Sequence, residues 1–422
     1  MKTAKGVTFL AVLVFLGPIF SVCAQPNVPK ETIPSDISGD LKTQIERLYS
    51  EDPTERAYAT VALGKIGNRA APAVPFLIGL LGDVAALKRD ETLRYGDNSL
   101  SLLPLDTNPA REAAKALSLI GEPATEPLVT ALKHDDSDVR ENAAYALGQI
   151  RDSRAAGPLV AVLKDKDEDV VKEAIVALGE IKDPLAVDPL VTILENRESR
   201  FRSDAAKALG KIKDVRVIRA LITALKDQEE SVRNGVAVGL GNLRDPVAVE
   251  PLIDVFLKDA KVRWNVAWAL GEIGEASVEP LLSALKNDDP DVRGWAAWAL
   301  GKVKAPRTIA YLLPLLGDKN AKVRENTSDA LGKMGKSALY PLLRSMQEDD
   351  SNVQAAAASA LGFIEDRRAV PLLINALKRG NPDVQRNVMW ALWKITGMGF
   401  EKDTEKWLRW WEQNKKGWES SR

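Results

Sequence analysis

The sequence contains little of the chemistry on which most catalytic and metal sites depend. Its 422 residues include one cysteine, Cys23, and one histidine, His134. A single cysteine cannot form an intramolecular disulfide. One cysteine and one histidine together are too few to supply the ligands of a zinc site. His134 lies in the charged turn LKHDDSD, where no Ser-His-Asp set is recognisable, and no phosphate-binding loop is present. The sequence therefore predicts no cofactor, no metal and no enzyme activity.

Neither sign of charge is in excess. Lys and Arg number 58 and Asp and Glu 59, which gives a formal net charge of -1. A long nucleic-acid groove requires a basic excess, so nucleic acid is not an expected partner. The charged fraction of 28% is too high for a protein with many membrane spans, and the apolar stretch Val7–Phe20 is short for a span.

This apolar stretch is typical of an export signal. Lys2 and Lys5 precede it, and SVCAQ follows it, with small residues placed for cleavage between Ala24 and Gln25. We therefore predict a signal peptide at residues 1–24 and a periplasmic or extracellular location. Cleavage removes two lysines and lowers the formal charge from -1 to -3.

Cys23 leaves a lipid anchor as a second interpretation. Bacterial lipoprotein signals usually carry Leu three residues before the modified cysteine and Gly or Ala directly before it. Phe20 and Val22 stand there instead, so the sequence favours free export over an anchor at Cys23. Residues 25–36 contain several prolines and are predicted to be a flexible linker.

One repeat dominates the rest of the chain. The tripeptide Ala-Leu-Gly, or a close variant, recurs every 30 or 31 residues after a first gap of 54. Eleven copies at one period indicate a repeat architecture. The leucine of each copy, here called the marker leucine, is Leu63, Leu117, Leu147, Leu178, Leu209, Leu240, Leu270, Leu300, Leu331, Leu361 or Leu392.

Each copy is predicted to be a helical hairpin of about thirty residues. In the unit Ala155–Asp183, PLVAVL has helical apolar spacing, with Pro158 near its start. The turn KDKDED supplies aspartates suited to the N-cap of a second helix, which ends just beyond the marker leucine. One hairpin cannot bury its apolar face alone. The sequence therefore predicts an all-α fold, an α-solenoid of about eleven hairpins over residues 37–396.

Two segments break the repeat. The long first gap is predicted to contain an insertion, residues 83–108, interpreted as a surface loop. Residues 397–422 abandon the pattern and carry Trp407, Trp410 and Trp411 on one side of a predicted helix. Because the last unit of a solenoid has an open face, this segment is predicted to be a Trp-rich capping helix.

The repeat resembles a known family. The pattern DxDVRxxAAxALGxIxDxxAxxPLxxAL, strongest over residues 120–396 and looser over 40–119, is similar to the short HEAT-like repeats of phycobilisome lyases. With its signal peptide, the chain resembles an exported bacterial member of that group. The resemblance implies a superhelix whose second helices line the concave wall. The same repeat serves lyases, hydroxylases, DNA glycosylases and scaffolds, so it does not specify a function.

An enzyme or enzyme accessory is therefore one alternative. Deoxyhypusine hydroxylases with these repeats hold two irons through His-Glu pairs on their second helices. The corresponding places here hold pairs such as Glu141-Asn142 and Trp264-Asn265, so that iron chemistry is not expected. The residues do not exclude a bilin-lyase role, but an export signal fits poorly with a pigment attached in the cytoplasm.

Alignment on the marker leucine separates packing positions from candidate binding positions. Residues one and four places before it are almost all small and are predicted helix contacts. Residues two and six places before it range from Lys and Asp to Trp, so these positions are predicted to face solvent on one side of the helix. By the resemblance, that side is the concave wall. The predicted partner-binding residues are Trp264, Trp268, Trp295, Trp298, Tyr145 and Trp390.

Clustered exposed tryptophans are typical of binding surfaces. The predicted function is therefore an exported, monomeric scaffold that binds a protein or peptide on its concave face. Two alternatives stay open for the tryptophans. Their rings can pack on small residues of the neighbouring unit, or they can stack on sugars in a carbohydrate-binding solenoid.

An arginine seven places before the marker leucine recurs too regularly for a specific site. With turn aspartates such as Asp138 and Asp291, it is predicted to form a charge-assisted ladder between units. Paired turn carboxylates such as Asp288–Asp289 are predicted to be cap residues, not acid–base pairs. The ladder arginines are Arg140, Arg202, Arg233, Arg263, Arg293 and Arg324.

Overall fold

The computed structural model describes residues 26, 28–87, 107–400 and 403–419. Within these ranges all regular structure is helical and forms eleven consecutive hairpins, which confirms the predicted α-solenoid. The chain divides into two compact units, Met1–Ile150 (unit 1) and Arg151–Arg422 (unit 2).

Some predictions lie outside the described residues. They are the export signal with its cleavage site at Ala24–Gln25, the lipid-anchor alternative at Cys23, and most of the insertion at residues 83–108.

Unit 1 contains three hairpins, preceded by the short turn η1 (Lys30–Thr32). Their helices are α1 (Gly39–Arg47) with α2 (Pro53–Ile66), α3 (Val74–Ile78) with α4 (Pro109–Ile120), and α5 (Thr125–Ala131) with α6 (Ser137–Ile150). Two 3-10 turns, η2 (Gly67–Ala73) and η5 (Glu122–Ala124), lead into α3 and α5.

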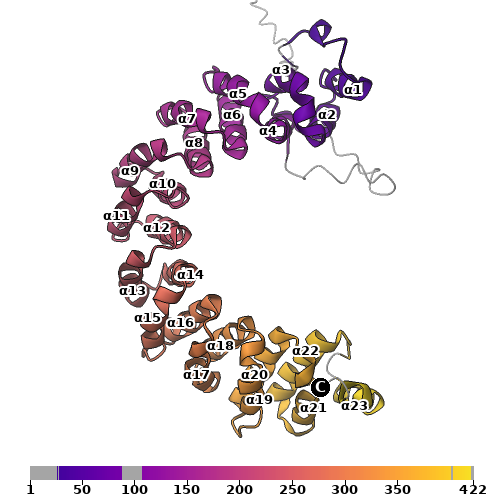
Figure 1. Ribbon diagram of the computed structural model, residues 1–422, viewed down its shortest axis with the longest axis vertical. Helices are drawn as coiled ribbons and strands as arrows, with labels where there is room; N and C mark the ends of the chain where they lie inside the picture. Colours follow the sequence, from indigo (N-terminus) through magenta and orange to yellow (C-terminus); the bar gives the residue numbers. More distant parts are fainter. Residues whose placement is uncertain (1–25, 27, 88–106, 401–402, 420–422) are drawn as a thin grey trace, which may run out of the picture. The chain divides into compact units, whose positions relative to one another are not determined.

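Unit 2 contains the other eight hairpins and the final helix α23 (Thr404–Glu419). The first helices form one row and the second helices another (Figure 1). The first helices are α7 (Ala156–Val162), α9 (Val187–Glu195), α11 (Val215–Ala224), α13 (Val249–Lys258), α15 (Val278–Ala284), α17 (Ile309–Leu312), α19 (Lys336–Ser345) and α21 (Val370–Arg379). The second helices are α8 (Glu168–Ile181), α10 (Arg202–Leu209), α12 (Glu230–Leu243), α14 (Arg263–Ile273), α16 (Pro290–Val303), α18 (Ala321–Lys333), α20 (Ser351–Ile364) and α22 (Pro382–Thr396).

The second helices begin at the capping residues of the turns. The side chains of Asp167, Asp289 and Asp350 accept a backbone N–H two positions further on and so cap α8, α16 and α20. Asn320 and Asn381 do the same for α18 and α22. The aspartates and asparagines of the turns therefore satisfy backbone donors at helix starts, and the aspartates also place negative charge where it is favourable.

The marker leucines explain the period of the repeat. Their side chains are completely buried in all eleven hairpins. The next residue is a glycine in nine of them, and it lets the following second helix approach closely. A Cβ added to Gly179 in α8 would lie 2.8 Å from the Cα of Ala208 in α10. In the last hairpin this position holds Trp393, whose side chain is 49% exposed.

The helix α23 covers the end of unit 2. It packs on α21, and its Trp407 is completely buried. The ring of Trp407 lies edge-on to that of Phe400 at 5.0 Å, and Trp411 is also buried. Arg367, at the start of the last hairpin, lies 4.0 Å above the ring of Trp418. The predicted Trp-rich capping helix is thus present, and its aromatic side faces the fold.

Candidate functional site

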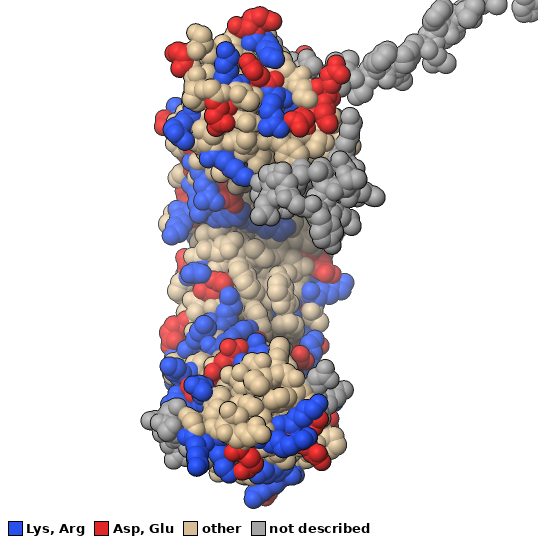
Figure 2. Space-filling model, turned by 90° about the vertical axis from the view of Figure 1, so that its right-hand side faces the viewer, with Lys and Arg blue, Asp and Glu red and all other residues tan. Residues whose placement is uncertain are grey.

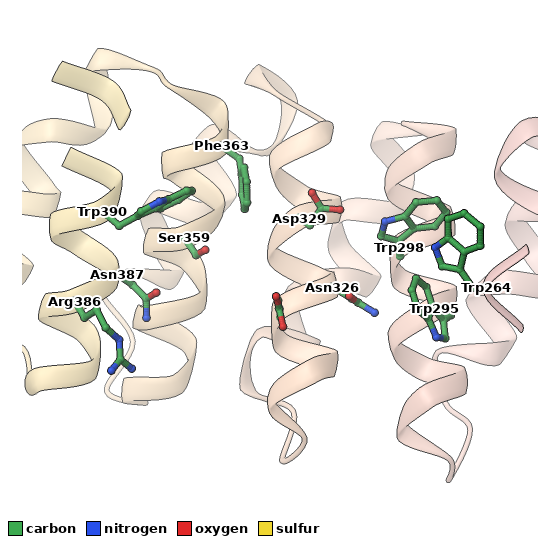
Figure 3. A pocket seen from close by; sticks show the side chains of 11 residues that line it. Trp264, Trp295, Trp298, Asn326, Asp329, Ser359, Phe363, Arg386, Asn387 and Trp390 are labelled. Carbon is green, nitrogen blue, oxygen red and sulfur yellow. The ribbon is translucent and has the colours of Figure 1, made fainter. Parts of the chain in front are cut away.

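The wall of second helices in unit 2 contains a groove of about 570 Å³. It extends over five consecutive second helices, α14, α16, α18, α20 and α22 (Figure 3). The lining combines aromatic, carboxylate and amide side chains. They are Trp264, Trp295, Trp298, Glu325, Asn326, Asp329, Ser359, Phe363, Arg386, Asn387 and Trp390.

Three tryptophans form one end of the groove. Trp264 comes from α14 and is 50% exposed, and Trp295 and Trp298 come from α16 (Figure 3). The last two rings lie edge to face, 5.9 Å apart and 77° from parallel. We call these three residues the α16 aromatic cluster. Its rings present edges and faces in several directions and do not form one flat platform.

Two aromatic residues form the other end. Phe363 of α20 and Trp390 of α22 also lie edge to face, with ring centroids 5.0 Å apart (Figure 3). Trp390 additionally rests on Gly362, because a Cβ added there would lie 2.5 Å from the indole. We call this pair the α22 aromatic cluster. It is partly held by helix packing and partly open to the groove.

Polar side chains separate the two clusters. Asp329 of α18 is paired with Lys333 at 2.5 Å, and Arg386 of α22 is paired with Asp383 at 2.7 Å. Glu325 is exposed and has no ion pair among the described residues. Among the described residues that line the groove, Glu325 therefore carries a charge that no ion pair compensates.

Lysines of α18 lie against the α16 aromatic cluster. The ammonium of Lys333 lies 4.7 Å from the ring centroid of Trp298, and that of Lys322 lies 5.6 Å from that of Trp295. Both distances are within the range of cation–π attraction. The indole faces of this cluster thus already accommodate cations.

Four of the six predicted partner-binding residues line the groove, and two do not. Trp264, Trp295, Trp298 and Trp390 are lining residues. The indole of Trp268 instead lies on Gly241, with the Lys302 ammonium 5.7 Å from its ring centroid. Its arrangement therefore matches the alternative in which rings pack on small residues of a neighbouring unit.

Tyr145, the sixth predicted residue, belongs to α6 in unit 1. It is half-buried, and the guanidinium carbon of Arg111 lies 3.5 Å from its ring centroid. The positions two places before the marker leucine are never fully buried in the eleven hairpins. This agrees with the solvent-facing position predicted for them.

Sequence reasoning missed several lining residues, of which Phe363 is the clearest. It stands two places after its marker leucine, where most other hairpins carry a polar residue such as Glu272, Lys302 or Lys333. A phenylalanine in a position that is usually polar could therefore have been recognised from the sequence as a candidate binding residue. Arg386 stands six places before its marker leucine, a position predicted to face solvent, but was not named as a binding residue. Asn326 and Asn387 stand five places before theirs, outside the predicted solvent-facing positions.

Three of the ladder arginines connect the turns of two successive hairpins. Arg202, Arg233 and Arg293 form ion pairs with Asp227, Asp259 and Asp318, which lie 25 or 26 residues further along the chain, in the turn of the next hairpin. Arg263 pairs with Asp289 in the same way, at 3.2 Å. Arg56, which the sequence analysis did not include, forms a buried pair with Asp83 in unit 1 at 2.5 Å.

The sequence analysis named Asp138 and Asp291 as partners of the ladder arginines. Asp291, named with the ladder, lies 3.9 Å from Lys322 and is not an arginine partner in the described structure. Arg140 and Arg324 donate to backbone carbonyls of the turn before their own helix. Asp227, Asp259 and Asp318 stand at the start of the next turn, whereas Asp289, the partner of Arg263, is itself the N-cap residue of α16.

The charge on this face is mixed. Figure 2 views the side on which the second helices lie. Around α12 and α14 the surface is hollowed and contains few charged side chains, whereas Lys and Arg are interspersed with Asp and Glu elsewhere in unit 2 (Figure 2). The single histidine, His134, is exposed in its turn and accepts the backbone N–H of Asp136 at 3.1 Å.

Within the described ranges, no three His, Cys, Asp or Glu side chains converge as a metal site would require. None of the helices in the same ranges has the length and apolar character needed to cross a membrane.

Comparison with known families identifies the repeat. A family model described as HEAT repeats matches eight overlapping segments, which together extend from residue 104 to residue 406. The segments are 104–178, 125–208, 158–238, 187–261, 218–279, 250–332, 278–352 and 341–406.

Individual relatives are more distant. The phycocyanobilin lyase subunit alpha of Picosynechococcus sp. is 31% identical over 127 residues, which are 29% of this chain and 38% of that protein. An engineered protein is 22% identical, with a TM-score of 0.35, over 86% of this chain and all of that one. Kap95, from the Kap95:Nup1 complex, is 14% identical, with a TM-score of 0.47, over 88% of this chain and 59% of that one. Neither structural likeness bears on function.

Proposed function

We propose that this chain is an exported scaffold that holds a protein or peptide partner in the groove of unit 2. The chain belongs to the HEAT-repeat family. The observation that carries the proposal is the α16 aromatic cluster, in which a half-exposed Trp264 adjoins the Trp295–Trp298 pair at the end of a groove of about 570 Å³. Large aromatic side chains in a concave surface supply much of the binding energy of protein interfaces.

The proposal is tested with peptides selected from a random displayed library on the purified chain. Binding of the selected peptides is then compared for wild type, Trp264→Ala and Trp298→Ala by fluorescence anisotropy. We expect a loss of about tenfold or more for each variant, because each removes a large contact surface. Tyr311→Ala is the matched control, since this tyrosine is 54% exposed on α17 and is not a groove residue. Selected peptides whose affinity ignores both tryptophans would contradict the proposal.

Export of a monomer is part of this proposal and rests on the sequence. The basic start, the apolar stretch and the small residues before Gln25 support cleavage by a signal peptidase. Amino-terminal sequencing of the exported protein is expected to begin at Gln25. A lipid-modified Cys23 in the membrane fraction, or an uncleaved cytoplasmic chain, would contradict it. Light scattering is expected to give the mass of one chain.

An accessory role in bilin attachment is the second candidate. The 31% identity over 127 residues to a phycocyanobilin lyase subunit favours it, although the match covers 38% of that protein. Purified chain is mixed with phycocyanobilin, and its absorbance spectrum is followed. A spectral change that Trp298→Ala abolishes would support the accessory role over the scaffold.

The acidic mature charge supports neither nucleic-acid nor anionic membrane partners.

A further inference from the structure

The distance between the two aromatic clusters sets the length of a partner that contacts both. Neighbouring second helices are in contact from α16 through α18 and α20 to α22, which makes three helix-to-helix steps. Packed helices are about 8–10 Å apart, so α16 and α22, which carry Trp298 and Trp390, are separated by about 24–30 Å. An extended chain advances about 3.3 Å per residue, so about eight residues connect the two clusters.

The negative charge between the two clusters determines which side chain is favoured in the middle of the bound segment. Glu325 is exposed on α18 and has no ion pair among the described residues, whereas Asp329 and Arg386 are compensated by Lys333 and Asp383. A cationic side chain opposite Glu325 would complete the pairing of the groove lining. An acidic side chain there would be repelled.

The ring arrangement argues for a polypeptide over a sugar chain. A sugar ring stacks on an open, flat indole face. In the α16 aromatic cluster two rings lie 77° apart, and Lys322 and Lys333 lie 5.6 and 4.7 Å from their centroids. The open feature is the groove that the half-exposed Trp264 lines together with these two rings. Rings set at steep angles around a groove suit one apolar side chain packed against their edges and faces.

We infer that the groove binds an extended polypeptide segment with one apolar anchor residue at each aromatic cluster, about eight residues apart, and a Lys or Arg between them opposite Glu325. This inference rests on the proposed function and adds the chemistry of the partner. The anchors supply affinity by burying apolar area. The central cation supplies discrimination among segments.

The anchor spacing is tested with synthetic fluorescent peptides of equal length and charge. Each carries two Phe residues separated by 4, 6, 8, 10 or 12 positions, one Arg midway and Ser/Thr elsewhere. The eight-residue spacing is expected to bind about tenfold more tightly than the four-residue spacing, which reaches only one cluster. The same series on Trp298→Ala and Trp390→Ala is expected to lose its dependence on spacing. Affinity that is equal across the wild-type series would overturn the inference.

The central charge is tested with Glu325→Gln. This change is expected to weaken the eight-residue Arg peptide about threefold to fivefold and to leave its Arg→Gln analogue unchanged, because the pair is partly screened by solvent. Glu250→Gln is the matched control, since it removes an exposed carboxylate from α13, away from the groove. An equal response of both peptides to Glu325→Gln would overturn the role of the cation.

The outcomes separate this inference from the function on which it rests. If library-selected peptides depend on Trp264 and Trp298 but the designed series shows no preference for spacing or charge, the scaffold function stands and the inference fails. If oligosaccharides on an array bind in a Trp264-dependent manner and no peptide does, both fail.

Discussion

Arg293 in α16 and Asp318 in the turn before α18 form a two-point ion pair between successive hairpins. Nε of Arg293 donates to Oδ2 of Asp318 at 2.8 Å, and Nη2 donates to Oδ1 at 3.0 Å. The remaining Nη1 donates to the carbonyls of Asn287 and Asp288 in the preceding turn. One side chain therefore connects the turns of two hairpins, and both charged groups are nearly buried.

Arg293→Lys is expected to destabilise unit 2 by about 1–2 kcal/mol, although it keeps the charge. An ammonium cannot make the parallel pair of hydrogen bonds and reach the turn carbonyls at the same time. The free energy of unfolding is measured by urea denaturation. Arg324→Lys is the control, because Arg324 bonds only to turn carbonyls in the described structure and should lose less. Equal losses would show that the carboxylate contributes little.

The same pair predicts a dependence of stability on pH. Burial acts to raise the pKa of Asp318, but the hydrogen bonds from Arg293 and from the backbone of Asn320 outweigh it, so this pKa lies below its ordinary value of 3.8. A carboxyl with a lowered pKa stabilises the folded state above its unfolded pKa and loses this contribution as pH falls through the folded pKa. The difference in unfolding free energy between wild type and Asp318→Asn is therefore expected to be constant near neutrality and to shrink below about pH 4. A difference that stays constant into that acid range would contradict the assignment.

Gly179→Ala is expected to destabilise the protein by about 1–3 kcal/mol. The new Cβ would lie 2.8 Å from the Cα of Ala208, so α8 and α10 must separate. Gly157→Ala is a control in the same hairpin. It adds the same methyl group to α7, has no atom within 4 Å, and should stabilise slightly through helix propensity. Thermal unfolding followed by circular dichroism measures both changes, and a neutral Gly179→Ala would show that the helices yield easily.

Trp407→Ala is expected to release α23 and to expose α21. The indole of Trp407 is completely buried, and truncating such a side chain costs about 3–5 kcal/mol. Because a repeat array opens locally, hydrogen exchange of the α21 amides reports this loss better than global unfolding does. Trp393→Ala, which truncates a 49% exposed indole, should leave that exchange near the wild-type rate. Protection of α21 that survives in Trp407→Ala would show that the cap contributes no stability.

Much of this architecture follows from sequence period and composition. The Ala-Leu-Gly period predicts the hairpins because a small–large–small triplet allows close helix approach around a buried leucine. Trp264, Trp298 and Trp390 were recognisable because they stand in variable positions of an otherwise regular helix, and Trp295 because it is a large aromatic residue beside them. The period assigns a residue to a helix face and does not assign the direction of its ring.

The contacts that the sequence did not specify have a common physical origin. Trp264 and Trp268 share one helix face, yet Trp268 turns onto Gly241 of the preceding hairpin, whereas Trp264 faces the groove. The ladder arginines pair with an aspartate about 25 residues away because stacking brings the next turn within reach. Both outcomes depend on contacts between hairpins, which the sequence of one hairpin does not contain.

The indole of Trp393 also has a consequence for the assembly of such arrays. Nine hairpins present a bare glycine to the helix that follows, and each therefore accepts a neighbour. The hairpin of α21 and α22 presents a half-exposed indole instead, so a second helix arriving at the usual separation would collide with it. At the end of unit 2, where α23 packs on α21, the second helix α22 therefore carries a bulky indole in the position at which nine other second helices carry glycine. The face on which a further second helix would pack is thus occupied by a side chain.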